Sequence, residues 1–250
     1  MRGADPQAPP GSRALSGWLH ALRYGATGGA LILVGFAAGL FLARVRSEAP
    51  RLPDFGPAPH YTLTNQLGET VSSARFAGKV QVVTFLFPYC TTYCPLIAAH
   101  LIGLGHLLQQ SAMRDRVEIV AFNVAPGEVG PKQMREFLAQ YGWNAADPHW
   151  QFLTGTPAQI HSVVTGGYHV DFERVADAGR DSEVEIEPGQ APQLTVANPL
   201  AEKMKPDFDI LHNDTIEIVG PDGRVRRIYD DADVVSNETL WNDIQLLLQN

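Results

Sequence analysis

The sequence predicts an α/β domain over residues 60–250, with a central mixed sheet flanked by helices, preceded by one N-terminal transmembrane helix. An uncharged apolar run of 20 residues near the N-terminus is long enough to cross a bilayer. Farther along, two apolar runs rich in β-branched residues are typical of buried strands, and segments with helical spacing of apolar residues alternate with them. The chain of 250 residues has two cysteines and a net charge of −8. These values argue against a disulfide-rich scaffold and against a nucleic-acid partner.

The predicted transmembrane helix covers residues 24–43, YGATGGALILVGFAAGLFLA, and is bracketed by Arg23 and Arg44. At about 1.5 Å per residue this run spans a hydrocarbon layer of about 30 Å. A signal peptide is the alternative, but its apolar region is typically about 7 to 15 residues long. We therefore expect an uncleaved anchor, with residues 1–23 as a short cytoplasmic tail and the proline-rich stretch 44–59 as a tether.

The first half of the domain is predicted to alternate strands and helices. Alternating apolar and polar residues predict a short hairpin within 60–79. The runs VQVVTFLF (80–87) and VEIVAFNV (117–124) are typical of central parallel strands, because residues buried on both faces of a sheet are apolar throughout. Apolar residues spaced three and four apart predict helices over 95–110 and 131–141.

The second half begins with a predicted helix over 157–164 and an alternating strand over 168–175. Residues 176–206 contain four prolines and an acidic run without either periodicity, which indicates an inserted acidic surface loop. TIEIVG and RVRRIYDD, separated by Pro-Asp-Gly, predict a hairpin over 215–231. An amphipathic helix is predicted over 236–249.

The two cysteines, Cys90 and Cys94, lie where the first buried strand ends and a helix begins, with Pro95 suited to the first helical turn. Unpaired N–H groups and the helix dipole at this end favour thiolates, which makes the sulfurs better nucleophiles and metal ligands. Residues four apart share a helix face, and their Cα separation of about 6 Å is within disulfide range. The pair therefore suits a reversible disulfide or chelation of one soft metal ion. Two unrelated buried cysteines, or an inert disulfide, are the alternatives.

Among the eight histidines, His212 is the candidate for a third group at this site. It lies in DFDILHNDTIEIV, just before a predicted strand, and the nearest preceding proline is Pro206. In a strand–helix fold of the thioredoxin type, the loop before this late strand packs against the start of the cysteine helix, and a proline is usual there. Since a histidine occupies the position here, we expect its imidazole to face the two thiols.

Two segments resemble the Sco/SenC family. FLFPYCTTYCP resembles its signature, in which a strand leads into Cys-x-x-x-Cys-Pro, and HNDTIEIVGPDGRV resembles its ligand histidine followed by a strand and a Pro-Asp-Gly turn. The resemblance implies a thioredoxin-like fold and a copper site formed by Cys90, Cys94 and His212. It also implies delivery of copper or of electrons to the dinuclear copper centre of cytochrome c oxidase, with subunit II as the recipient. The domain would then lie on the periplasmic or extracellular side of the cell membrane.

Soft thiolates with an imidazole suit Cu(I), and they suit Cu(II) with a fourth ligand, whereas structural zinc usually takes four protein ligands. Copper is therefore the expected metal.

Two functions that do not depend on a metal are also compatible with the residues. The first alternative is a membrane-tethered thiol–disulfide oxidoreductase without metal, in which Cys90 attacks and Cys94 resolves. The second is a structural assembly factor that docks through its acidic surface and does not need its cysteines.

Overall fold

The computed structural model describes residues 35–40, 53–176, 196–204 and 206–249. The chain divides into two units, Met1–Arg51 and Leu52–Asn250. In the first unit the described residues are helical and exposed, and the remainder of the predicted transmembrane run lies outside the described residues. Within the described ranges, we find no helix that is both long and apolar enough to span a membrane.

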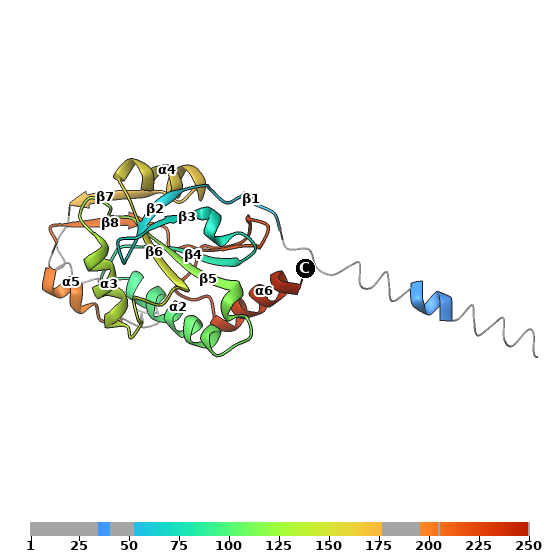
Figure 1. The fold of residues 1–250 in the computed structure, drawn as a ribbon. Coiled ribbons are helices and arrows are strands. Elements are labelled where there is room, and N and C mark those ends of the chain that lie inside the picture. Colours follow the sequence, from blue (N-terminus) through green and yellow to red (C-terminus); the bar gives the residue numbers. More distant parts are fainter. Residues whose placement is uncertain (1–34, 41–52, 177–195, 205, 250) are drawn as a thin grey trace, which may run out of the picture. The chain divides into compact units, whose positions relative to one another are not determined.

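The second unit is built on an eight-stranded mixed sheet, with strand order β1-β10-β9-β4-β5-β6-β2-β3 (Figure 1). The three central strands β4, β5 and β6 are parallel, and the flanking strands β9 and β2 run antiparallel to them. The strands are β1 Gly56–Pro57, β2 Thr62–Asn65, β3 Thr70–Ser72, β4 Val80–Leu86, β5 Val117–Asn123, β6 Trp150–Thr154, β9 Ile216–Val219 and β10 Arg224–Tyr229. The predicted mixed sheet is therefore present.

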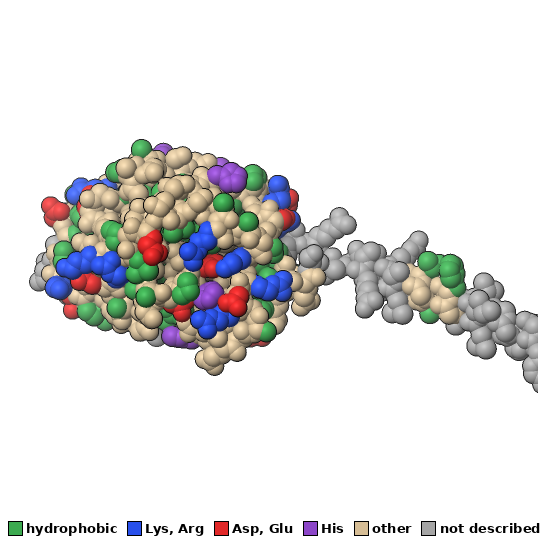
Figure 2. Space-filling view, in the orientation of Figure 1, with side chains coloured by type: hydrophobic (Ala, Val, Ile, Leu, Met, Phe, Trp, Pro, Cys, Tyr) green, Lys and Arg blue, Asp and Glu red, His purple; other side chains and the backbone are tan. Residues whose placement is uncertain are grey.

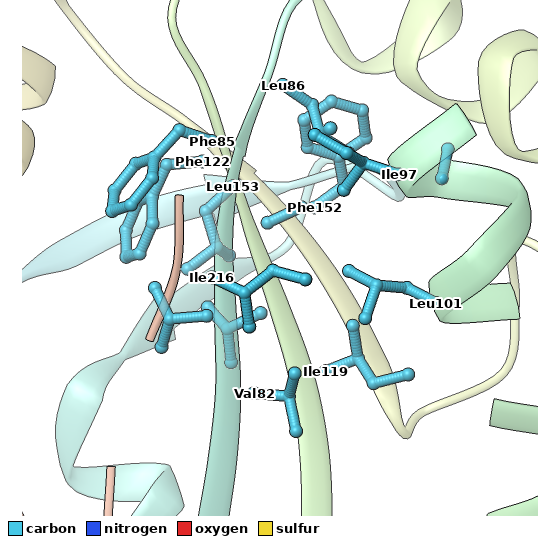
Figure 3. Close-up of a cluster of buried hydrophobic side chains, with 14 of the residues drawn as sticks. Val82, Phe85, Leu86, Ile97, Leu101, Ile119, Phe122, Phe152, Leu153 and Ile216 are labelled. Carbon is cyan, nitrogen blue, oxygen red and sulfur yellow. The ribbon is translucent and has the colours of Figure 1, made fainter. Parts of the chain in front are cut away.

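Helices cover both faces of this sheet. Figure 1 shows α4 on one face and α2 and α6 on the other. In Figure 3, Ile97 of α2 lies beside Leu86 and Phe152, and Leu101 lies beside Ile119, on the opposite side of the strands from Phe85. Burial of these apolar side chains supplies most of the stabilisation. The helices are α2 Cys94–Gln109, α3 Pro131–Gln140, α4 Pro157–Gly167, α5 Pro199–Met204 and α6 Asn237–Gln249, with short 3-10 turns at Ser73–Phe76 and Arg114–Arg116.

The two central strands confirm the inference from their apolar runs. Every residue of β4 and of β5 is buried, and they pair in parallel from Val80 opposite Val117 to Leu86 opposite Asn123. The third parallel strand, β6, was not predicted. It pairs with β5 from Ile119 opposite Trp150.

A second, two-stranded sheet is formed by β7 Phe172–Ala176 and β8 Phe208–His212. The predicted strand over 168–175 begins four residues later than expected, because His169 adopts a left-handed backbone with φ of 60° after α4. In the predicted insertion, 177–195 and 205 lie outside the described residues, and the described part includes the short helix α5. On the face shown in Figure 2, basic and acidic side chains are interspersed.

Candidate metal centre

The loop after β4 carries one cysteine, and α2 begins with the other. Cys94 is the first residue of α2 and Pro95 the second, one residue before the predicted helix start. Cys90 lies in irregular chain, where its N–H donates to the Phe87 carbonyl at 3.0 Å. Cys90 therefore does not share a helix face with Cys94. The loop instead places Cys90 close enough to Cys94 for each thiol to shift the pKa of the other.

Both cysteines are free thiols and both are buried, but not equally. Cys94 is 0% exposed and Cys90 is 7% exposed. The Phe87 N–H donates to Cys94 Sγ at 3.5 Å, and Thr92 Oγ1 lies 3.3 Å from Cys90 Sγ. Cys90 is therefore the thiol that an incoming reagent or partner reaches first.

The two thiols differ in pKa, so that Cys90 loses its proton more readily than Cys94. A hydrogen bond from the Cys94 side chain lowers the pKa of Cys90 to about 6, against the opposing effect of burial, and Thr92 adds to the lowering. The same hydrogen bond, then burial and the charge on Cys90, raises the pKa of Cys94 well above its usual value. The predicted favouring of thiolate thus holds for Cys90 and is wrong for Cys94, because adjacent negative charges repel.

His212 reaches this pair from a distant part of the chain. It is the last residue of β8, opposite Phe172 of β7, and its Nε2 lies 3.4 Å from Cys94 Sγ across a separation of 118 residues. Its Nδ1 lies 3.0 Å from the Asn213 carbonyl oxygen. Because a carbonyl only accepts hydrogen bonds, Nδ1 carries a proton, and in the neutral ring Nε2 presents its lone pair to the sulfur. The structure thus brings together the three side chains that the sequence singled out.

The three side chains are adjacent in pairs, Cys90 with Cys94 and Cys94 with His212. In the part of the chain that the structure describes, no three or more His, Cys, Asp or Glu side chains are already grouped at the spacing of metal ligands, so Cys90 and His212 would have to close in on an ion held by Cys94. Cys90, Cys94 and His212 offer two sulfurs and an imidazole nitrogen, and these donor atoms suit a soft ion such as Cu(I).

Two residues near the site were not found by sequence reasoning. Asp214 is half-buried, and burial first, then the charge on Cys90, raises its pKa to about 6 although His212 opposes this. Its position two residues after the histidine is the signal that could have identified it. Asn198 donates to the carbonyls of Pro88 and Cys90 in the dithiol loop. It follows a proline-rich segment with no periodicity, so no sequence signal marks it.

Comparisons with known proteins point to one family. The model of the SCO1/SenC family matches residues 53–187, just over half of the chain. The SCO1 protein homolog of Bacillus subtilis is 26% identical over 217 residues, which cover 86% of this chain and 96% of that protein.

Solved structures of Sco proteins have a similar fold. Copper-bound ScoI of Bradyrhizobium japonicum superimposes with a TM-score of 0.57 at 20% identity, covering 77% of this chain and 100% of that one. BsSco, described as having a disulfide switch and as belonging to the Sco family of cytochrome c oxidase assembly proteins, gives 0.57 at 23% identity over 79% and 97%. These likenesses confirm the thioredoxin-like α/β fold. From the family model, the chain belongs to the SCO1/SenC family.

Proposed function

We propose that this protein binds one copper ion through Cys90, Cys94 and His212 and passes it to a recipient during assembly of the dinuclear copper centre of cytochrome c oxidase. The observation that carries the proposal is the 3.4 Å approach of His212 Nε2 to Cys94 Sγ. Local chain geometry does not impose this approach, since 118 residues separate the two. The copper bound in ScoI of Bradyrhizobium japonicum and the assembly role named for the family of BsSco support the proposal.

The site can take up Cu(I) with a defined proton balance. Cys90 enters as a thiolate, because its pKa is lowered to about 6. Cys94 enters as a thiol and releases its proton to solvent when it binds the ion, and His212 contributes the Nε2 lone pair. Two thiolates and one nitrogen hold Cu(I), and Cu(II) takes a further ligand. A two-electron oxidant, such as a second disulfide that is reduced in exchange, would form the Cys90–Cys94 disulfide and remove both thiolates, so oxidation releases the metal.

The anchor and the compartment belong to the same proposal. We assign residues 24–43 as the membrane anchor, 1–23 as the cytoplasmic tail and the stretch from 44 as the tether, and the domain then lies on the periplasmic or extracellular side. The tether ends earlier than the predicted residue 59, because Gly56–Pro57 pairs with β10 as part of the sheet. A dithiol that cycles with a disulfide is compatible with that side, because the cytosol keeps such thiols reduced. Subunit II of the oxidase is the proposed recipient.

The test is Cu(I) binding by the reduced full chain in detergent, measured by competition with a chromophoric Cu(I) chelator. We expect one ion per chain, and a first shell of sulfur and nitrogen by X-ray absorption. His212→Ala is expected to lower the affinity at least tenfold and to remove the nitrogen, whereas His60→Ala, an exposed histidine on the approach to β2, changes neither. Full affinity and an unchanged first shell in His212→Ala would refute the three-ligand assignment.

A second function is favoured by one observation, the lowered pKa of Cys90. A thiolate at neutral pH, next to a protonated partner thiol, is the arrangement of a thiol–disulfide oxidoreductase. This alternative expects reduction of a disulfide substrate that depends on Cys90 and Cys94 and is indifferent to His212. Assaying Cys90→Ser, Cys94→Ser and His212→Ala for both copper binding and disulfide reduction separates the two functions. Normal oxidase assembly with Cys90→Ser would instead support the purely structural role.

A further inference from the structure

The dithiol loop is held by a buried amide from a distant segment. Asn198, which precedes α5, is 4% exposed. Its Nδ2 donates to the Pro88 carbonyl at 2.9 Å and to the Cys90 carbonyl at 2.7 Å, across separations of 110 and 108 residues. The two hydrogens of one side-chain amide therefore bind the backbone on both sides of Tyr89.

The other half of the same amide is bound to the body of the domain. Asn198 Oδ1 accepts from Gln140 Nε2 at 2.9 Å and from the Ala201 N–H at 3.2 Å. Gln140, the last residue of α3, in turn accepts from the Leu200 N–H through Oε1 at 3.1 Å. All four hydrogen-bonding positions of the Asn198 amide are thus used. The amide connects the dithiol loop to α3 and α5.

The loop needs such a partner because it has no regular structure of its own. The chain between β4 and α2 is irregular. A buried carbonyl without a partner costs about 1 to 3 kcal/mol, so replacing Asn198 releases the loop or leaves two carbonyls unsatisfied. Asn198 touches the backbone of Cys90, and among the described contacts its hydrogen bonds reach neither sulfur. It therefore acts on the thiols through the position of the Cys90 main chain.

We propose that Asn198 is a positioning residue that holds Cys90 against Cys94, and so sets both the dithiol–disulfide equilibrium and, resting on the proposed function, the affinity for Cu(I). Without it, the loop samples more conformations, and the effective concentration of one sulfur at the other falls. Asn198, near the end of the inserted segment 176–206, thus fixes the position of the dithiol loop.

The test measures the equilibrium of the full chain in glutathione buffers, in which the two thiols and one glutathione disulfide give the Cys90–Cys94 disulfide and two glutathione thiols. Asn198→Asp keeps the oxygen that accepts from Gln140 and Ala201, but places a second oxygen against two carbonyl oxygens. Asn198→Ala removes the amide. We expect both to lower the equilibrium constant for disulfide formation at least tenfold, about 30 mV for this two-electron couple. The Cu(I) affinity is expected to fall by a similar factor.

The matched control is Asn65→Asp. Asn65 is equally buried, donates to Glu69 and Gln151, and accepts backbone hydrogen bonds in the turn after β2, away from the dithiol. This substitution should destabilise the domain while leaving the dithiol equilibrium within twofold of wild type. If the Asn198 variants also stay within twofold, the positioning role is overturned and Asn198 is merely structural.

Two further outcomes keep the test decisive. Should the Asn198 variants not fold, Gln140→Ala removes a support of the amide without touching the loop, and we expect a smaller shift in the same direction. An unchanged equilibrium in Gln140→Ala would then overturn the proposal. Failure of the wild-type chain to bind Cu(I), with the expected redox shifts in the Asn198 variants, would overturn the copper function and leave the positioning role intact.

Discussion

Replacing Glu217 by Gln is expected to stabilise the domain at pH 8 to 9 and to change little near pH 5. Glu217 lies on β9, is 2% exposed, and its Oε1 has no hydrogen-bond partner. It lies between Val83 of β4 and Ile228 of β10. Burial, with a smaller contribution from the charge on Asp230, raises its pKa from 4.5 to about 8.

The direction of this pH dependence follows from the number of protons that the folded and unfolded states bind. Between pH 4.5 and about 8 the folded protein keeps the Glu217 proton and the unfolded chain loses it. Stability from this group is therefore fully present below pH 4.5 and is lost as the pH rises through about 8. At about 1.36 kcal/mol per pH unit, the interval between the two pKa values gives a ceiling of about 5 kcal/mol, and we expect several kcal/mol.

The assay is urea unfolding of wild type and Glu217→Gln from pH 5 to pH 9. Glu118→Gln is the matched control, because Glu118 is also buried in the central sheet but is paired with Lys79 at 2.6 Å. Removing that carboxylate should destabilise the domain by about 1 kcal/mol at neutral pH, since Lys79 loses its partner. Parallel pH profiles for wild type and Glu217→Gln would refute the argument that this buried carboxyl group sets the pH dependence of stability.

Three other predictions test the packing and the thiols. Gly105→Ala in α2 should destabilise the domain by about 1 to 3 kcal/mol in thermal unfolding, because the new Cβ would lie 2.6 Å from the Trp143 ring. Gly103→Ala on the same helix is the control, because its Cβ meets only the Asn237 side chain, at 3.2 Å. An equal loss of stability in Gly103→Ala would contradict the steric explanation. Thr156→Ala should cost about 1 kcal/mol, because the Thr156 hydroxyl accepts from the Gln159 N–H at the start of α4; no change in chemical denaturation would argue against this cap. Iodoacetamide should alkylate Cys90 faster as the pH rises through about 6, and Cys94→Ala should move this midpoint upward because the donated hydrogen bond is lost; an unmoved midpoint would show that Cys94 does not stabilise the thiolate.

The elements found from the sequence are those whose pattern is local. The apolar runs of β4 and β5 are typical of central strands, and the Pro-Asp-Gly turn marked the hairpin of β9 and β10. The same reasoning missed β6 and β8. Trp150–Thr154 is buried throughout, so it does not alternate, and Gln151 interrupts its apolar run; Phe208–His212 is recognised as a strand from its pairing with β7. Pairing of this kind depends on a partner strand that periodicity cannot identify.

For the site, the sequence by itself determined the donor atoms and the local position of the thiols. The two cysteines and the start of a helix lie within a few residues of each other, so short-range geometry places them together. Only the tertiary structure decided that Cys90 carries the charge and Cys94 the proton, and that Asn198 holds the loop. These properties arise from desolvation and from contacts over more than a hundred residues of chain, which exist only after the chain has folded.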